Sequence, residues 1–92
     1  MKIDFDPGKS RKNEETRDLP FNQVANFEWE TAIYSEDLRL DYPERRFVAM
    51  GYLGDRLHIL CFTPIDGGIR VISFRKANSR EVNHYEKGTT NR

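Results

Sequence analysis

The chain has 92 residues, of which 33% are charged and 37% hydrophobic, and its formal net charge is +0. This length fits one domain with a modest core, and the balanced charge excludes a protein that is strongly basic or acidic throughout. An aromatic content of 12% argues against a disordered chain. We therefore expect a single domain over residues 1–92, with a loose tail at residues 88–92.

The single cysteine, Cys61, excludes an internal disulfide and a cysteine-cluster zinc site. It lies in an apolar run, so we expect it to be a core residue. The sequence shows neither a signal peptide nor an apolar stretch of membrane length, and it carries no metal-binding or phosphate-loop motif. We expect a cytoplasmic protein with no cofactor and no membrane partner.

The N-terminal third predicts one strand and two helices. Residues 1–6 alternate apolar and acidic side chains, which is typical of a short half-buried strand. Asp6 followed by Pro7 is a helix-start signal and predicts a helix over residues 7–16, whose polar composition indicates light packing. After Pro20 the apolar spacing predicts a second short helix.

The rest of the chain predicts a sheet followed by a helix. Glycine-containing turns separate the longer strands and indicate hairpins. Asn78 and Glu81 form a capping-box pattern, which predicts a helix over residues 79–87. The expected order, β-α-α-β-β-β-β-α, indicates an α+β fold with a mostly antiparallel β-sheet, two N-terminal helices and one C-terminal helix. Residues 33–34 and 38–40 are short candidate strands, and the longer expected strands cover residues 46–53, 57–63 and 69–75.

Residues 69–85 change from strand to helix and are locally basic. Residues 70–92 contain six Lys or Arg against two Glu, a local charge of +4. Such a patch is the electrostatic footprint of an anionic partner, although a solvated strand and helix explain the same charges. Strand alternation predicts Ser73 and Arg75 on one face and Arg70 on the other.

Two charged residues precede the first long strand. Alternation places Glu44 and Arg46 on one side and Arg45 on the other. A carboxylate and a guanidinium on one side form either a simple ion pair or a general base beside a phosphate clamp. The two histidines, His58 and His84, are isolated and do not predict a metal site.

Several short segments, taken together, follow one another along the chain in a characteristic order. They are Ile3-Asp4-Phe5-Asp6-Pro7-Gly8-Lys9, Asn13, Leu19-Pro20-Phe21, Glu44-x-Arg46-Phe47, Gly51, and Arg70-x-Ile72-Ser73-x-Arg75-Lys76-Ala77 with Arg80-Glu81 and Tyr85. This set resembles the BrnT family, the toxins of type II toxin–antitoxin modules. The resemblance covers about residues 3 to 87, and its last segment is the most specific part.

The resemblance implies a compact RelE-like fold and an endoribonuclease that blocks translation and arrests growth. It implies neutralisation by a BrnA-like antitoxin, a ribbon-helix-helix protein that binds operator DNA, and a toxin homodimer within that complex. Carried over to this sequence, the implied catalytic residues are Glu44, Arg46, Arg70, Arg75 and Arg80. The implied RNA-binding residues are Phe5, Lys9, Lys76 and Tyr85.

Two positions depart from the family pattern. Phe5 stands where the family commonly has Trp, and its ring can still stack on a base. The family's Lys-His-Gly after the first helix reads Thr16-Arg17-Asp18, and a guanidinium stays protonated and cannot transfer protons. Activity is then slow, rerouted through Glu44 or Tyr85, or lost. The alternative function is a catalytically weak or inactive binding module that engages antitoxin or nucleic acid through its basic face.

The leading hypothesis is metal-independent cleavage, in which the substrate's own 2′-hydroxyl attacks the adjacent phosphate. Glu44 acts as the general base or orients the nucleophile, and the four arginines hold the phosphate and stabilise the developing charge. A small DNA-binding regulator is disfavoured, because the sequence shows no helix-turn-helix or ribbon-helix-helix pattern.

Overall fold

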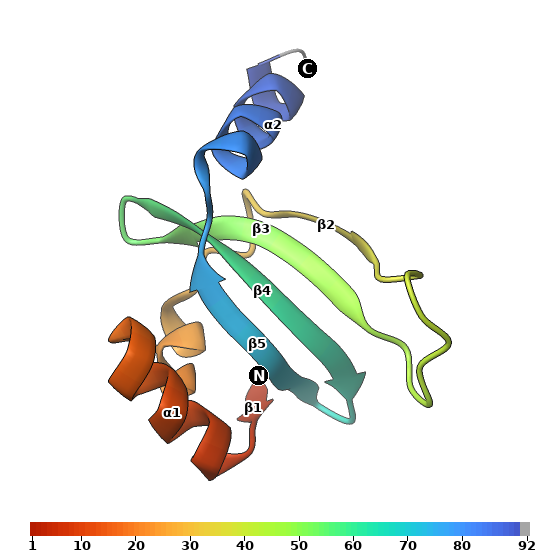
Figure 1. The fold of residues 1–92 in the computed structure, drawn as a ribbon. Helices are drawn as coiled ribbons and strands as arrows, with labels where there is room; N and C mark the ends of the chain where they lie inside the picture. The colour runs from red at the N-terminus through yellow and green to blue at the C-terminus, as the bar shows by residue number, and fades with distance from the viewer. Residues whose placement is uncertain (91–92) are drawn as a thin grey trace.

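The computed structural model describes residues 1–90, which form one five-stranded sheet with helices at both ends of the chain. Figure 1 shows α1 beside β5, and α2 beyond the end of that strand. The element order and the α+β class agree with the sequence prediction. In chain order the elements are β1 (Lys2–Asp4), α1 (Pro7–Arg17), η1 (Phe21–Asn26), β2 (Ile33–Glu36), β3 (Phe47–Leu53), β4 (Arg56–Ile65), β5 (Gly68–Lys76) and α2 (Ser79–Thr90).

The sheet has the strand order β1-β5-β4-β3-β2 and is mixed, which corrects the prediction of a mostly antiparallel sheet. Strands β2 to β5 pair antiparallel in sequence, whereas β1 runs parallel to β5. Hairpin signals constrain only strands that a short turn joins. No short turn joins β1 to β5, because the paired residues, such as Asp4 and Arg70, are far apart in the sequence.

Gly68 permits the close approach of β1 to β5. Lys2 lies opposite Gly68 in the parallel register. A Cβ atom at Gly68 would lie 1.8 Å from the backbone oxygen of Lys2, which is far inside van der Waals contact. A larger residue at this position would therefore displace β1 from the edge of the sheet.

The helices differ from the predicted layout in two respects. The second N-terminal helix, η1, is a 3-10 helix, in which the three-residue spacing brings Phe21 and Val24 to the same buried side. Helix α2 includes residues 88–90, where a loose tail was expected, and residues 91–92 lie outside the described part. Residues 38–40, predicted as a strand, belong to a loop instead. Within residues 1–90, no helix has the length and apolar character needed to cross a membrane.

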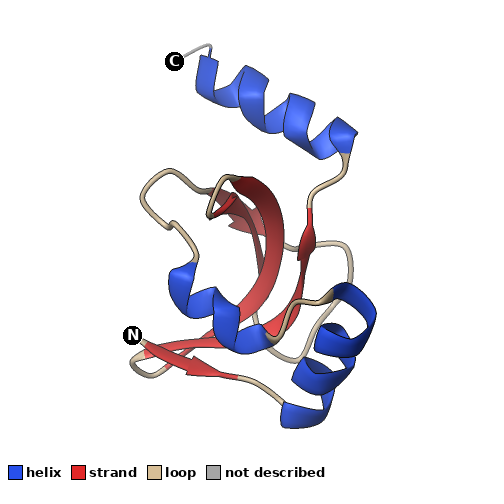
Figure 2. Cartoon of the chain, turned by 90° about the vertical axis from the view of Figure 1, so that its left-hand side faces the viewer, coloured by secondary structure: helices blue, strands red, loops and turns tan. Residues whose placement is uncertain are grey.

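The two faces of the sheet contact different helices. Helices α1 and η1 lie on the side of the main core, whose largest fully buried side chains are Val24, Leu60 and Phe74. On the other face, Tyr85 of α2 packs in a smaller cluster with Leu57. Figure 2 shows α1 and η1 close together and α2 apart from them. Because α2 covers only part of its face, the remainder of that face stays open.

A β-bulge interrupts the alternation of β5. Ser73 lies opposite Cys61, but the next pair along the ladder joins Val71 to Phe62, so Ile72 is an extra residue. The extra residue shifts every side chain on its N-terminal side to the opposite face.

The bulge changes which arginines share a face. Arg70 lies opposite Thr63 and Arg75 lies opposite Ile59, and two residues of β4 that are four apart point the same way. Arg70 is therefore on the face of Arg75, and the prediction that alternation separates them is wrong. A strict two-residue pattern cannot reveal a bulge, since it assumes that no residue is inserted.

Candidate active site

Two hollows meet at strand β5. The first, named the cleft, has a volume of about 510 Å³ and is lined by Ser35, Glu36, Asp37, Leu38, Arg39, Val48, Ile59, Cys61, Ser73, Arg75 and Glu81. The second, named the groove, has a volume of about 390 Å³ and is lined by Lys9, Lys12, Asn13, Thr16, Arg17, Phe21, Ile72, Ser73, Phe74 and Arg75. Ser73 and Arg75 line both, so the two hollows adjoin at β5.

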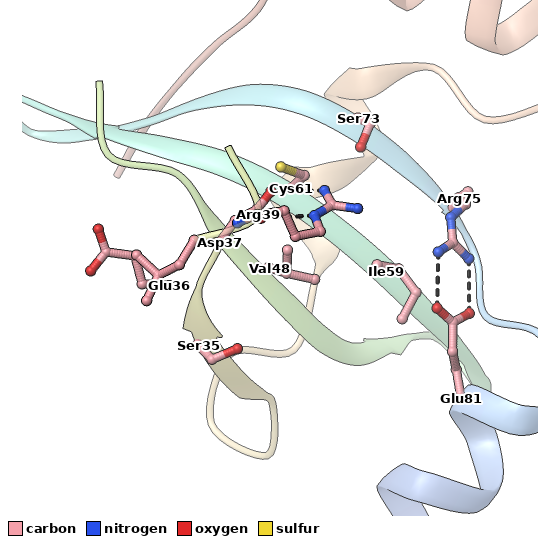
Figure 3. A pocket seen from close by; sticks show the side chains of 11 residues that line it. Ser35, Glu36, Asp37, Arg39, Val48, Ile59, Cys61, Ser73, Arg75 and Glu81 are labelled. Carbon is pink, nitrogen blue, oxygen red and sulfur yellow. Dashed lines mark hydrogen bonds and ion pairs between the residues drawn. The ribbon is translucent and has the colours of Figure 1, made fainter. Parts of the chain in front are cut away.

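Arg75 forms a bidentate ion pair with Glu81 at one end of the cleft (Figure 3). Its two terminal nitrogens lie 2.8 and 2.9 Å from the two carboxylate oxygens. The guanidinium lowers the pKa of Glu81 below its usual value, so the carboxyl is charged at neutral pH. Sequence reasoning missed this pair, because the two residues lie on different elements.

The capping box predicted for α2 is confirmed. The backbone nitrogen of Asn78 donates to the Glu81 carboxylate at 2.9 Å, and the backbone nitrogen of Glu81 donates to the Asn78 side chain at 2.8 Å. The same carboxylate therefore starts α2 and holds Arg75. This double use fixes the orientation of Arg75 relative to the helix.

Arg39 is a second cation of the cleft, and the sequence analysis did not single it out. Its side chain donates two hydrogen bonds of 2.8 Å to Asp37, which also accepts one from the Tyr42 hydroxyl at 3.2 Å. These bonds hold the pKa of the buried Asp37 carboxyl well below its usual range. Figure 3 shows Arg39 near Cys61. An Asp and an Arg two residues apart in a loop carry no sequence signal that separates them from a surface ion pair.

Glu44 and Arg46 line neither hollow, and they form an ion pair next to Asp37, at the end of the cleft away from Arg75. A terminal nitrogen of Arg46 lies 3.3 Å from a Glu44 oxygen, and its guanidinium packs over the Tyr42 ring at 4.2 Å. Along the strand ladder, Arg46 is two strands and about four residues from Arg75, roughly 16 Å between Cα atoms. The predicted same-side arrangement exists, but it does not bring Glu44 to Arg75.

The other cationic candidates are divided between the two ends of β5. Arg70 is paired with Asp4, with its nitrogens 2.8 Å from one carboxylate oxygen. Lys76 and Arg80 are exposed, and they flank the junction of β5 and α2 near Arg75. Lys76 pairs with His58 and Arg75 with Ile59, so their side chains point to opposite faces of the sheet, and Arg70 lies about 13 Å from Arg75 along the strand.

The aromatic candidates are used for packing. Phe5 is half-buried, and its ring contacts Phe21 edge-on with the centroids 6.0 Å apart. Tyr85 is only 4% exposed, and its hydroxyl donates to the backbone oxygen of Thr31 at 2.8 Å. The Tyr85 ring is therefore not accessible to a base in this structure. Lys9, in contrast, lines the groove.

The groove is cationic and contains the position of the family histidine. Lys9, Lys12 and Arg17 lie along α1, and these three make no ion pair with any of the described residues. Arg17 shares the groove with Arg75, so the position that departs from the family lies beside the candidate phosphate site. Sequence reasoning missed Lys12, although its spacing from Lys9 is that of one helix face.

Asn13 fastens α1 to β5 along the groove. Its side-chain nitrogen donates to the backbone oxygens of Leu19 and Phe74 at 2.7 and 2.9 Å. The second bond reaches the edge of β5 beyond the end of β1. Asn13 therefore determines how closely the cationic side of α1 approaches Arg75.

Cys61 and His58 are buried, and neither is placed as a nucleophile or ligand. Cys61 is 9% exposed, which confirms the core prediction, and burial raises the pKa of its thiol. His58 is 3% exposed, and its Nδ1 lies 2.8 Å from the backbone oxygen of Arg56. Within residues 1–90, no three His, Cys, Asp or Glu side chains converge as a metal site requires.

The family model of the ribonuclease toxin BrnT, of the type II toxin–antitoxin system, matches residues 5–81. This range includes α1, most of the sheet and the first residues of α2, and thus both hollows. Searches among curated proteins and among solved structures gave no match. Since the family model covers well over half of the 92 residues, the chain belongs to the BrnT family of ribonuclease toxins.

Proposed function

We propose that the protein is an endoribonuclease toxin that cleaves RNA without a metal ion, inhibits translation and arrests growth in the cytoplasm. A BrnA-like ribbon-helix-helix antitoxin neutralises it in a complex that contains a toxin homodimer and binds operator DNA through the antitoxin. Membership of the BrnT family supports the ribonuclease and toxin roles. The observation that carries the placement of the chemistry is Arg75, which lines both the cleft and the groove.

In the proposed reaction, the 2′-hydroxyl of one ribose attacks the neighbouring phosphorus and the bond to the 5′-oxygen breaks. The products are a 2′,3′-cyclic phosphate and a free 5′-hydroxyl, whose oxygen takes a proton from water as it leaves. Arg75 exchanges its carboxylate partner for the phosphate, because a guanidinium binds both groups in the same bidentate way. Its charge then stabilises the negative charge that grows on the phosphate oxygens in the transition state.

Proton acceptance is assigned to Glu81 in place of Glu44. Glu81 is charged at neutral pH and already contacts Arg75, whereas Glu44 contacts Arg46 at a distance of roughly 16 Å from that arginine. A general base must lie within hydrogen-bonding reach of the proton that it removes. We propose that the remaining arginines of the sequence-based site hold RNA on either side of the reacting phosphate: Arg46, Arg70 and Arg80.

The second candidate function is a catalytically weak or inactive binding module. It is favoured by Arg17, which cannot transfer protons and which lies in the same groove as Arg75. In this alternative the basic surface holds antitoxin or nucleic acid and cuts neither.

Two measurements separate these functions. Purified protein is incubated with RNA in EDTA, and the chain alone is expressed from an inducible promoter. The ribonuclease predicts RNA fragments with 2′,3′-cyclic phosphate ends and growth arrest. Intact RNA together with normal growth would reject it in favour of the binding module. Cleavage that EDTA abolishes would reject metal independence alone.

A further inference from the structure

The three cations that α1 contributes to the groove lack the acidic partners that the arginines of the cleft have. Arg39 and Arg75 are each held by a carboxylate within 3 Å. Lys9, Lys12 and Arg17 make no ion pair within residues 1–90, and no Asp or Glu side chain lines the groove. The groove therefore keeps a net positive charge for an external anion.

Helix stability does not explain two of these cations. The first turn of α1 has no acidic residue and carries Lys9, which lies near the positive end of the helix dipole. Lys12 repeats the same charge one turn later. Only Arg17, in the last turn, suits the dipole. Two positive charges therefore lie on one side of the helix where the helix dipole does not favour them. This arrangement indicates a negatively charged ligand.

The groove offers charge but no aromatic ring on which a base could stack. Its aromatic lining residues, Phe21 and Phe74, are 3% and 1% exposed, so neither ring is available for stacking. The Asn13 amide nitrogen is committed to two backbone oxygens. Phosphate contacts position a nucleic acid without reading its sequence, whereas base contacts specify it.

We propose that the groove binds the phosphate backbone of single-stranded RNA independently of sequence and leads the strand to Arg75. Lys9 and Arg17 are eight residues apart, about 12 Å along the helix, which suits a strand better than a single anion. The groove ends at Ser73 and Arg75, which also line the cleft. The inference rests on the proposed function, and it makes Arg17 a phosphate ligand at the family's histidine position.

The test measures binding apart from cleavage. The probes are two fluorescein-labelled 2′-O-methyl RNAs of unrelated sequence, in which the blocked 2′-oxygen cannot attack. Binding is followed by anisotropy across salt concentrations for Lys12→Ala, Arg17→Ala and their double variant. Arg11→Ala is the matched control, because Arg11 is exposed on the same helix and does not line the groove.

Each single variant is expected to weaken binding of both probes roughly three- to tenfold and to reduce the slope of log Kd against log salt by about 0.7. Arg17→Lys is expected to restore most of the affinity, and Arg11→Ala to change it little. Thermal unfolding of each variant checks that the fold is retained. Equal binding by wild type and the double variant overturns the inference, even where ordinary RNA is cleaved.

Two further outcomes separate this inference from the proposed function. Groove-dependent binding of the probes without cleavage of ordinary RNA upholds the groove assignment and rejects the ribonuclease. Failure to bind either probe, together with groove-dependent binding of polyglutamate, identifies a site for an acidic peptide and overturns the RNA assignment. Loss of affinity for one probe alone overturns sequence independence.

Discussion

The cleft and the groove share Arg75 but differ in how their charges are compensated. In the cleft, carboxylates hold the arginines in fixed orientations, which is what a preorganised catalytic site needs. In the groove, the cations of α1 are uncompensated among the described residues and are suited to a polyanion. In the proposed function, the pairing of charges, and not their number, distinguishes the reaction site from the surface that guides the substrate.

The largest expected effect separates the two candidate bases. Glu81→Gln keeps the capping box, since Gln serves in that motif, but it removes the proton acceptor beside Arg75. We expect the cleavage rate to fall roughly a hundredfold, and Glu44→Gln to cost much less. Single-turnover cleavage of labelled RNA measures both. A larger loss for Glu44→Gln would return the base to the position that the sequence indicated.

The link between α1 and β5 is tested through Asn13. Asn13→Ala leaves the backbone oxygens of Leu19 and Phe74 without their side-chain donor, and we expect about 1–3 kcal/mol less stability toward urea. RNA affinity should fall as well, because α1 is no longer held at a fixed distance from β5. Asn22→Ala, at an exposed position of η1, is the control. Unchanged stability would show that α1 is positioned by other contacts.

Arg17→His tests whether the groove reaches the chemistry. The substitution places a group that titrates near pH 6.5 next to Arg75, and we expect the rate at saturating RNA to rise roughly tenfold. The half-saturating RNA concentration should rise too, since a neutral imidazole binds phosphate weakly. The rate profile should acquire an inflection between pH 5 and 8. An unchanged profile would show that the residue at position 17 takes no part in proton transfer.

The smallest expected effect concerns His58, which belongs to neither hollow. Burial lowers its pKa in the folded protein, so below about pH 6.5 the unfolded chain binds a proton that the folded chain does not. Stability should therefore decrease as the pH falls from 7 to 5, by at most about 1.4 kcal/mol per unit. Urea titrations should show a flatter dependence for His58→Gln, and no change of slope for the exposed His84→Gln.

Local patterns were sufficient for much of the fold. The Asp6–Pro7 start of α1, the capping box of α2 and the hairpins joining the last three strands depend on neighbouring residues, and each is present. The parallel pairing of β1 and the bulge at Ile72 were not predictable, because they depend on contacts between distant segments and on an inserted residue.

The candidate site was predictable only in part. The charges at Arg75 and Lys9 were visible in the sequence, and the resemblance to the family grouped them. The ion pair with Glu81 and the meeting of α1 with β5 arise from tertiary packing, so no spacing rule predicts them. The resemblance implied Tyr85 as an RNA-binding residue, whereas in the structure its hydroxyl bonds to the backbone of Thr31 and its ring packs against Tyr52.

The central claim is that RNA is cleaved at the junction of the two hollows, where Arg75 lies. Single-turnover cleavage of 5′-labelled RNA in EDTA tests it directly for wild type, Arg75→Ala and Arg45→Ala. Arg45 is a matched control, since it also pairs with a glutamate but lines neither hollow. We predict at least a tenfold loss for Arg75→Ala, consistent with the removal of a transition-state contact, and little change for Arg45→Ala. Undiminished cleavage by Arg75→Ala would contradict the account.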